Sequence, residues 1–458
     1  MPCYYRCREF FFAFCLQGPA VIINEKENDM EKKALGSLLA LSIAVLAMVA
    51  GSAGISHATN GYFSHGYSIE SKAMAGAGVA LPQGSLDAAI NPALMVFIGN
   101  RIDLGLSLFN PNREYTINGA PSGMPGTLGL TPGTVKSGTE WFLIPSLGIN
   151  RKLDDNSSLG ISIFGNGGMN TDYSANTYYD FSVSSTGVDL MQLFISPTYA
   201  RKLTPKHAIG ISPILAFQSF EQIGLQSLGN MGFSSDPAHI ANNGHENSYG
   251  YGARIGYYGE LSPYLSIGAS YQTKIWMSRL KKYAGLFAEQ GDFDIPSNWT
   301  IGVAVKPTAA LTFLFDVQQI YYNDVNSVGN PMLPNLMLSL LGNDNGSGFG
   351  WKDMTVYKFG VQWQSSKDWT WRAGYSFGEQ PIPDSEVLFN ILAPGVIEQH
   401  ATIGFTRAIG SNQDLSFALT RAFSKSISGQ NPLEVPGQQT IQLKMNQWEV
   451  SVGYTWKF

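Results

Sequence analysis

The sequence has few charged residues. Only 14% of its 458 residues are Asp, Glu, Lys or Arg, whereas soluble domains contain about 25%. Mean hydropathy is nevertheless close to zero, at −0.03, which argues against a bundle of membrane-spanning helices. Low charge with neutral hydropathy is typical of a β-barrel whose strands turn one face to lipid and the other to water. The net charge of −5 and the absence of a long basic run give no indication of a nucleic-acid partner.

Cysteine and long apolar runs are also missing from most of the chain. The three cysteines are Cys3, Cys7 and Cys15, so the remainder cannot contain a disulfide framework. After residue 58 no run reaches the roughly 18 apolar residues that a membrane-spanning helix needs. Such a chain can still cross a membrane as a closed barrel, because lipid requires every backbone polar group to be paired within the protein.

One apolar run does occur, near the beginning of the sequence. Residues 30–58 contain two basic residues (Lys32 and Lys33), then a mostly apolar stretch, then small residues ending at Ala58. This pattern predicts a secretory signal peptide, and the alternative of a membrane anchor fits less well because the run is short and ends in a cleavage signal. We expect cleavage near Ala58, and we interpret residues 1–29 as an upstream extension from a mis-assigned start.

Alternating apolar and polar side chains dominate the rest of the sequence. From Trp448 to the terminal Phe458 every second residue is aromatic or aliphatic, which is the pattern of a strand between lipid and a polar interior. Fourteen segments show this alternation, and single-chain bacterial barrels have an even number of strands. The predicted strands are residues 100–110, 139–150, 157–169, 187–203, 206–220, 248–260, 263–277, 297–306, 310–323, 351–364, 368–378, 398–409, 413–424 and 446–458.

The connections between these strands differ in length in a regular way. Short polar turns alternate with long connections, as expected when turns gather at one end of an outer-membrane barrel and loops at the other. The long connections are residues 111–138, 170–186, 221–247, 278–296, 324–350, 379–397 and 425–445. We therefore predict an all-β protein, a 14-stranded antiparallel transmembrane β-barrel over residues 100–458. A soluble β-sandwich or propeller is the alternative, but neither requires aromatic girdles, a signal peptide and a terminal Phe together.

Residues 59–99 do not alternate and are rich in Ala and Gly. Short helices are plausible there, one of them with Ser85 as its N-cap and an interruption at Pro92. About forty apolar, weakly charged residues ahead of a barrel have the right size for a plug inside it. The alternative is a solvated periplasmic tail, against which the apolar composition argues.

This segment also carries a family resemblance. The stretch "NGYFSHGYSIESKAMAGAGVALPQGSLDAAINPALM", with Asn91, Pro92 and Ala93 near its end, resembles the N-terminal hatch of the outer-membrane long-chain fatty acid transporter family (FadL-like), which includes toluene and xylene uptake proteins. Segments 145–173, 295–320 and 350–385 resemble the family in the same order. The resemblance implies a fourteen-stranded barrel with an N-terminal hatch, and it places the hatch or gate at Asn91, Pro92 and Ala93.

The sequence contains no recognisable catalytic or cofactor-binding motif. It lacks HExxH and P-loop patterns, and its six histidines show no metal-ligand spacing. The one GxSxG match, at residues 374–378, falls in an alternating strand and not at the strand–turn–helix elbow that this motif needs for catalysis. We therefore expect no enzyme activity, no cofactor and no metal. A barrel enzyme such as a lipase would need a nucleophile, a base and an acid, which cannot be assembled from these residues.

Two regions are candidates for handling an apolar ligand. The first is a set of apolar residues in the long connections 221–247 and 278–296, which the resemblance implies form a capture groove: Leu225, Leu228, Phe233, Leu286 and Phe287. The alternative is that these residues only pack on one another. The second is "FGNGGMN" in the third strand, whose glycines indicate a bulge and by resemblance a kink that opens the barrel wall: Gly165, Gly167 and Gly168.

The expected function is passive outer-membrane uptake of hydrophobic small molecules, most simply long-chain fatty acids, by loop capture, hatch rearrangement and lateral exit. Arg254 and Arg372 are candidate carboxylate contacts, but no base follows Phe220 at the loop where the family is expected to have one. Neutral hydrocarbons or aromatics such as toluene are therefore an alternative cargo, and a general porin is another. Expected partners are the ligand, outer-membrane lipid and, through Phe458, the barrel-assembly machinery, with the chain a monomer.

Overall fold

The computed structural model describes residues 60–458, and the predicted upstream extension and signal peptide lie outside the described residues. These residues form one antiparallel sheet of sixteen strands. Two short strands lie beside the wall: β2 (Gly133–Lys136), which pairs with β1, and β9 (Trp276–Met277), which pairs with β7. No helix in residues 60–458 is both long enough and apolar enough to cross a bilayer.

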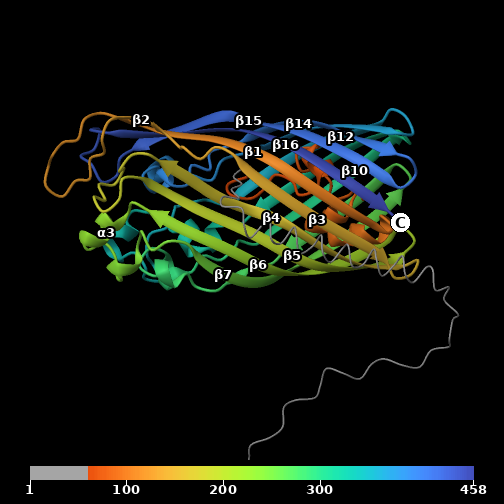
Figure 1. Ribbon diagram of the computed structural model, residues 1–458, viewed down its shortest axis with the longest axis horizontal. Helices are drawn as coiled ribbons and strands as arrows, with labels where there is room; N and C mark the ends of the chain where they lie inside the picture. Colours follow the sequence, from red (N-terminus) through yellow and green to blue (C-terminus); the bar gives the residue numbers. More distant parts are fainter. Residues whose placement is uncertain (1–59) are drawn as a thin grey trace, which may run out of the picture. The chain divides into compact units, whose positions relative to one another are not determined.

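The other fourteen strands close into a cylinder (Figure 1). They are β1 (Arg101–Asn118), β3 (Phe142–Lys152), β4 (Ser157–Tyr173), β5 (Thr186–Thr204), β6 (His207–Ile223), β7 (Glu246–Ser262), β8 (Leu265–Gln272), β10 (Asn298–Thr308), β11 (Leu311–Ile320), β12 (Met354–Gln364), β13 (Trp369–Gly378), β14 (Gln399–Ile409), β15 (Gln413–Gln430) and β16 (Thr440–Lys457). β1 and β16 pair along their whole length, from Arg101 with Lys457 to Asn118 with Thr440. Pairing of the first and last strands closes the sheet, so the predicted 14-stranded barrel is confirmed.

The alternation along the strands separates an apolar outer face from a polar inner face. On β16, Trp448 is 45% exposed on the outside while its neighbour Glu449 is 2% exposed on the inside. Two arginines on the outer face lie over aromatic rings, Arg407 over Trp369 at 5.3 Å and Arg421 over Trp448 at 4.6 Å. Each long aliphatic stem can thus lie against apolar surface while its charge reaches the membrane edge.

The two ends of the barrel differ, as the connection lengths predicted. Short turns and the C-terminus lie at one end, and the long connections with β2 and the helix α3 lie at the other (Figure 1). Near the long connections several strands run further than predicted, since β1 ends at Asn118, β15 ends at Gln430 and β16 begins at Thr440. The predicted loops 111–138 and 425–445 are therefore partly strand, because these three neighbours continue to pair above the region where lipid would enforce alternation.

The long connections also contain short helical turns. They are α3 (Gln226–Asn230), η3 (Pro237–His239), η4 (Lys281–Tyr283), α4 (Ala288–Gly291), η5 (Tyr322–Asp324), α5 (Asn326–Gly329), α6 (Asn335–Leu338), η6 (Asp384–Glu386) and η7 (Phe389–Ile391). Their apolar side chains join one large buried cluster with the upper strands. The connections are therefore packed structure rather than free loops.

Residues 60–99, which we call the hatch segment, are almost entirely buried and contact the inner faces of many strands (Figure 1). The segment contains α2 (Ile69–Lys72), η1 (Ser85–Ala89) and η2 (Pro92–Phe97). The prediction of Ser85 as an N-cap was wrong, because Gly84 holds that position. The Ser85 backbone N–H and hydroxyl instead donate to Asp103 on β1, so this serine attaches the segment to the wall.

Candidate functional site

An apolar pocket lies where the long connections meet the upper strands. We call it the loop pocket, and it is lined by Val188, Phe220, Gln222, Leu225, Leu228, Leu286, Phe287, Ser327, Leu341, Ser347, Gly348, Phe349, Phe389 and Leu392. Four of the five loop residues predicted to contact ligand are among them. The fifth, Phe233, packs against the same apolar cluster without lining the pocket.

Packing in the loop pocket is tight. Phe220 contacts the rings of Tyr283 and Phe287 at 4.8 Å between centroids, and Leu225 and Leu228 are buried. The cavity is only about 30 Å³, whereas pockets for small ligands usually measure about 300–1,000 Å³. A ligand must therefore displace side chains or shift a connection to enter.

The lining of the loop pocket contains no charged side chain. Its polar side chains are Gln222, Ser327 and Ser347, which can each make neutral hydrogen bonds. A carboxylate buried here would lack a cation, and burying an unpaired charge is strongly unfavourable. The chemistry of the lining therefore suits a neutral apolar molecule.

A second feature is an interruption in the barrel wall between β3 and β4. The ladder joining them runs from Lys152–Ser158 to Leu147–Ile163 and stops there, although β4 continues to Tyr173. Further along, the backbone N–H of Gly138 donates to the carbonyl of Asp172 at 2.7 Å, which joins the two sides again. The interval between these two attachments is a stretch of wall without a backbone ladder, which we call the wall window.

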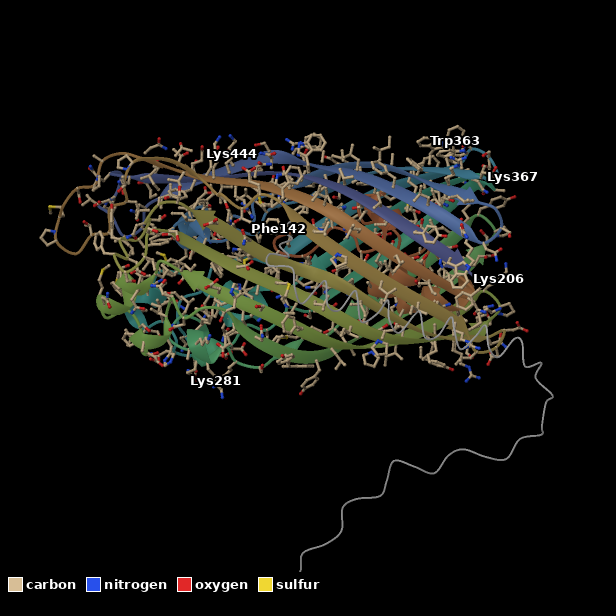
Figure 2. The ribbon with its side chains drawn as sticks, in the orientation of Figure 1. Phe142, Lys206, Lys281, Trp363, Lys367 and Lys444 are labelled. Carbon is tan, nitrogen blue, oxygen red and sulfur yellow. The ribbon has the colours of Figure 1, made fainter. Side chains whose placement is uncertain are left out.

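Arg113 of β1 crosses the upper part of the wall window. Its guanidinium donates to the carbonyl of Asn170 on β4 at 2.6 Å and to the carbonyl of Thr139 ahead of β3. It also lies over the ring of Phe142 at 5.6 Å, and Figure 2 shows Phe142 part of the way along the barrel. Between its two backbone attachments the window is therefore bridged by side-chain contacts that can rearrange.

Beside the window, β4 bends into the barrel interior. Every residue from Ser162 to Met169 is buried, so this part of the strand has lost the inside–outside alternation seen elsewhere. The β4–β5 register skips Asn166, between Gly165 and Gly167, which is a β-bulge at the predicted glycine cluster. The amide of Asn166 donates to Gln192 at 3.0 Å and its oxygen accepts from the Tyr67 hydroxyl.

The start of the hatch segment is bonded to this bulge. The N–H of Ser64 donates to the carbonyl of Asn166 at 2.9 Å, and the N–H of Gly168 donates to the carbonyl of Tyr62 at 3.0 Å. A side chain on Gly167 would overlap the Tyr62 carbonyl, so the backbones meet directly. Movement of the hatch segment and of the window's edge are therefore mechanically linked.

The predicted gate residues lie at the opposite side of the hatch segment. Asn91 caps η2, because its side-chain oxygen accepts from the Ala93 N–H at 3.0 Å and Pro92 occupies the first helical position. The Asn91 amide also donates to the carbonyls of Val79 at 2.8 Å and Tyr257 at 2.9 Å. One side chain thus shapes the segment and attaches it to β7.

The two arginines proposed as ligand contacts are placed at hatch–wall contacts and not at the loop pocket. Arg254 donates to the carbonyl of Ala89 and to Gln272, and the Nε of Arg372 donates to Gln83 at 3.1 Å. A role for either in ligand binding stays a prediction. The space beside Arg254 is polar, with Asn298, Thr300, Gln318 and Lys358 also around it. An apolar molecule therefore has little reason to descend through the barrel axis.

Several lining residues were not foreseen from the sequence. Val188 and Phe220 are inward strand positions, and Phe349, Phe389 and Leu392 come from connections remote in sequence from residues 221–247. The apolar run at 387–392 is the one signal that could have identified the last two. Phe181 and Leu338, which are 88% and 80% exposed, add further apolar surface on the long connections.

Comparison with known proteins agrees with this architecture. The family model described as "Outer membrane protein transport protein (OMPP1/FadL/TodX)" matches residues 43–458. No curated protein matches the chain. Among solved structures, the chain is similar to the toluene transporter TodX of Pseudomonas putida, at 19% identity and a TM-score of 0.64, covering 86% of this chain and 99% of that one.

Two further structures have the same fold. The toluene transporter TbuX of Ralstonia pickettii is 18% identical with a TM-score of 0.58, covering 86% of this chain and 99% of that one. A FadL homologue of Pseudomonas aeruginosa is 16% identical with a TM-score of 0.64, covering 87% and 100%. The chain therefore belongs to the outer membrane protein transport protein family (OMPP1/FadL/TodX), whose members are outer-membrane β-barrels that transport hydrophobic compounds.

Proposed function

We propose that this protein takes up neutral hydrophobic small molecules, such as monoaromatic hydrocarbons or alkanes, across the outer membrane. We infer the class of ligand from the loop pocket, whose lining is apolar with a few neutral polar groups and no cation. Relatives described as toluene transporters support the same class. Long-chain fatty acids, the simplest expectation from the family resemblance, would need a partner for their carboxylate.

The proposed route has three steps. The ligand leaves water at the apolar surface of the long connections and enters the loop pocket as side chains move apart. The hatch segment then shifts, with Asn91, Pro92 and Ala93 as the attachment that must yield or flex. The ligand leaves through the wall window beside Gly165, Gly167 and Gly168, which avoids the polar space next to Arg254. The proposed transport is passive, so consumption of the ligand inside the cell sets the direction of net uptake.

Uptake by cells tests the cargo class. A strain lacking this protein is complemented with wild type or with Leu228→Asp, and uptake of radiolabelled toluene, dodecane and oleate is measured at concentrations where simple diffusion is slow. We expect wild type to raise toluene or dodecane uptake and to leave oleate unchanged. Leu228→Asp should reduce that gain by about tenfold or more, because an unpaired charge in the apolar pocket costs several kcal/mol.

Leu153→Asp is the matched control, because Leu153 is 56% exposed at a short turn. It should take up ligand like wild type, and both variants should show the gel mobility of a folded barrel. Faster uptake of oleate alone would reverse the cargo assignment. Large steady ion currents from purified protein in planar bilayers would instead support a general porin.

A further inference from the structure

A large groove lies on the outer wall, away from the loop pocket and the wall window. We call it the outer groove, and it is lined by Tyr199, Arg201, Ile209, Gly210, Ile211, Ile255, Gly256, Tyr257, Ala269, Ser270, Tyr271, Trp299 and Ile301. It crosses β5, β6, β7, β8 and β10, of which β5, β6 and β7 lie side by side in Figure 1. Its volume of about 730 Å³ is within the range of ligand sites.

The cause of the groove is visible in the contacts behind it. A closed cylinder is convex outside, so a concavity means that the wall bends inward. Gly210 and Gly256 are paired across β6 and β7, and a side chain on either would overlap Pro92 or Asn91 of the hatch segment. The wall backbone therefore rests directly on the hatch segment. On the outside, Ala269 gives the groove a shallow floor among large neighbours.

The groove has apolar walls of the kind that hold a hydrocarbon chain. Ile211 and Ile255 are directly paired, and Tyr271 and Trp299 are paired further across the sheet. Ile209, Ile255 and Ile301 are each about half exposed, so the apolar surface faces outward. A flexible chain in this groove would meet surface on three sides, whereas on the convex wall it would meet surface on one.

One end of the groove lies near the short turns, and the other extends along the wall to Trp299 and Ile301 at the start of β10. Ile209 and Ile211 directly follow the β5–β6 turn, and Ala269 follows the β7–β8 turn. Figure 2 shows Lys206, which belongs to the β5–β6 turn, at that end of the barrel. In outer-membrane barrels the short turns face the periplasm, so the end of the groove that carries Arg201 and Ile209 lies in the leaflet made of phospholipid.

A cation is placed at the rim of the groove. Arg201 is exposed on the outer face of β5 and forms no hydrogen bond or ion pair with any residue of the described part of the chain, 60–458. The other basic residues of this turn are engaged, since Lys206 pairs with Glu260 at 3.1 Å and Lys202 donates to the carbonyl of Asp155 at 3.0 Å. Arg201 interacts electrostatically with Asp154 of the neighbouring turn but makes no ion pair with it. Its guanidinium is therefore the basic group of this turn that is positioned to bind a phosphate, which guanidinium groups do well.

We propose that the outer groove binds one phospholipid of the periplasmic leaflet. One acyl chain lies over Ala269 between the aliphatic walls, and the phosphate accepts hydrogen bonds from Arg201. Because the wall at Gly210 and Gly256 rests on Pro92 and Asn91, the bound lipid supports the wall where it holds the hatch segment. This site differs from the transport route, and its test does not depend on the cargo.

Native mass spectrometry of the purified protein tests the proposal. The protein, in detergent micelles, is given phosphatidylglycerol, phosphatidylethanolamine or lipopolysaccharide, and adducts that survive activation are counted. Wild type should retain one phospholipid. Ala269→Trp should lower retention by about tenfold, because it fills the volume that an acyl chain would occupy. Arg201→Gln should lower phosphatidylglycerol retention about fivefold through loss of a charge-assisted hydrogen bond.

Matched controls exist on the far wall. Ala373→Trp places the same ring on the outer face of β13, and Arg407→Gln removes another exposed arginine at the short-turn end. Both should retain phospholipid like wild type, and all variants should show folded-barrel gel mobility. The proposal fails if wild type retains no phospholipid, if the two Trp variants or the two Gln variants behave alike, or if lipopolysaccharide is retained instead.

Discussion

At the scale of single residues, polar side chains decide where the hatch segment is attached. Asp316 of β11 accepts from the backbone N–H groups of Gly78 and Val79 at 2.8 and 2.9 Å. Asn91 makes two bonds within the hatch segment and one to the Tyr257 carbonyl of β7. Such buried bonds contribute modestly when made but are costly when one partner is removed. Stability of the hatch segment therefore depends on a few identifiable groups.

Replacing Asn91 tests this dependence. Asn91→Ala leaves the carbonyls of Val79 and Tyr257 without their donor, and we expect local opening of the hatch segment to become easier by about 1–3 kcal/mol. Faster amide exchange of residues 78–94, followed by mass spectrometry, is the measurement. Asn247→Ala, at an exposed position on β7, is the control. Unchanged exchange in the Asn91 variant would contradict the role assigned to this side chain.

Gly167 is a second residue of this kind, because there is no space for a β-carbon beside the Tyr62 carbonyl. Gly167→Val pushes a branched side chain into the Tyr62 carbonyl, and overpacking of this kind costs about 1–3 kcal/mol. We expect uptake of the proposed ligand to fall to about a fifth of wild type or less, with normal amounts of protein in the outer membrane. Ligand quenching of tryptophan fluorescence should persist, since the loop pocket is untouched. Wild-type uptake would remove Gly167 from the exit route.

At the scale of elements, the connection 278–296 carries an unusual carboxylate beneath the loop pocket. Burial raises the pKa of Asp292 to about 6, and Asp294 and Glu289 act in the same direction. Its backbone carbonyl accepts from Ser327, which lines the loop pocket. The ordinary Asp pKa is about 3.9, so the folded connection prefers the protonated form.

Because the folded pKa of Asp292 is raised, the stability of connection 278–296 falls as the pH rises. Asp292 destabilises the connection least below about pH 4, and it destabilises the connection increasingly as pH rises through about 6. Amide exchange of residues 278–296 is compared between wild type and Asp292→Asn at the same pH. We expect the variant to be better protected at about pH 7.5 and equal to wild type at about pH 4. Equal protection at both values would argue against a raised pKa.

Comparison of the strands and connections with their predictions shows which features could be recognised from the sequence. All fourteen strands were predicted because each lies between lipid and a polar interior, which forces alternation at every second residue. Some ends near the long connections were predicted too short, as at Asn118 of β1, because pairing continues there without lipid. Others were predicted too long, as at β8, which ends at Gln272 instead of residue 277. The bulge was predicted from glycines. The loop pocket was not predicted in full, because Phe349 and Phe389 reach it from connections that are distant in the sequence and show no periodic pattern.

At the scale of the whole molecule, the first and last strands must meet for the barrel to close. β16 pairs with β1 and β15 and ends just before Phe458, whose N–H donates to the carbonyl of Asn100. The terminal Phe is the residue through which the family resemblance implies recognition by the barrel-assembly machinery. Removing it should therefore affect assembly more than the stability of the finished barrel.

Deletion of Phe458 tests this separation. We expect the amount of heat-modifiable protein in the outer membrane to fall about fivefold, while the fraction that does assemble keeps wild-type thermal stability, since surface changes outside the core are usually within ±0.5 kcal/mol. Phe313→Ala, which removes an exposed aromatic side chain from the outer face of β11, is the control and should assemble normally.

The predicted signal-peptide cleavage after Ala58 has its own test. N-terminal sequencing of the assembled wild type should give Thr59 as its first residue.

The wall window has one further consequence, which concerns molecular dimensions. Because backbone attachments hold it at both ends, at Leu147–Ile163 and at Gly138–Asp172, the aperture cannot lengthen without unzipping strands. Passage then depends on a molecule's narrowest cross-section and hardly on its length. Slender chains and single flat rings could thread through end-on, whereas bulky polycyclic compounds of equal hydrophobicity would be sieved out.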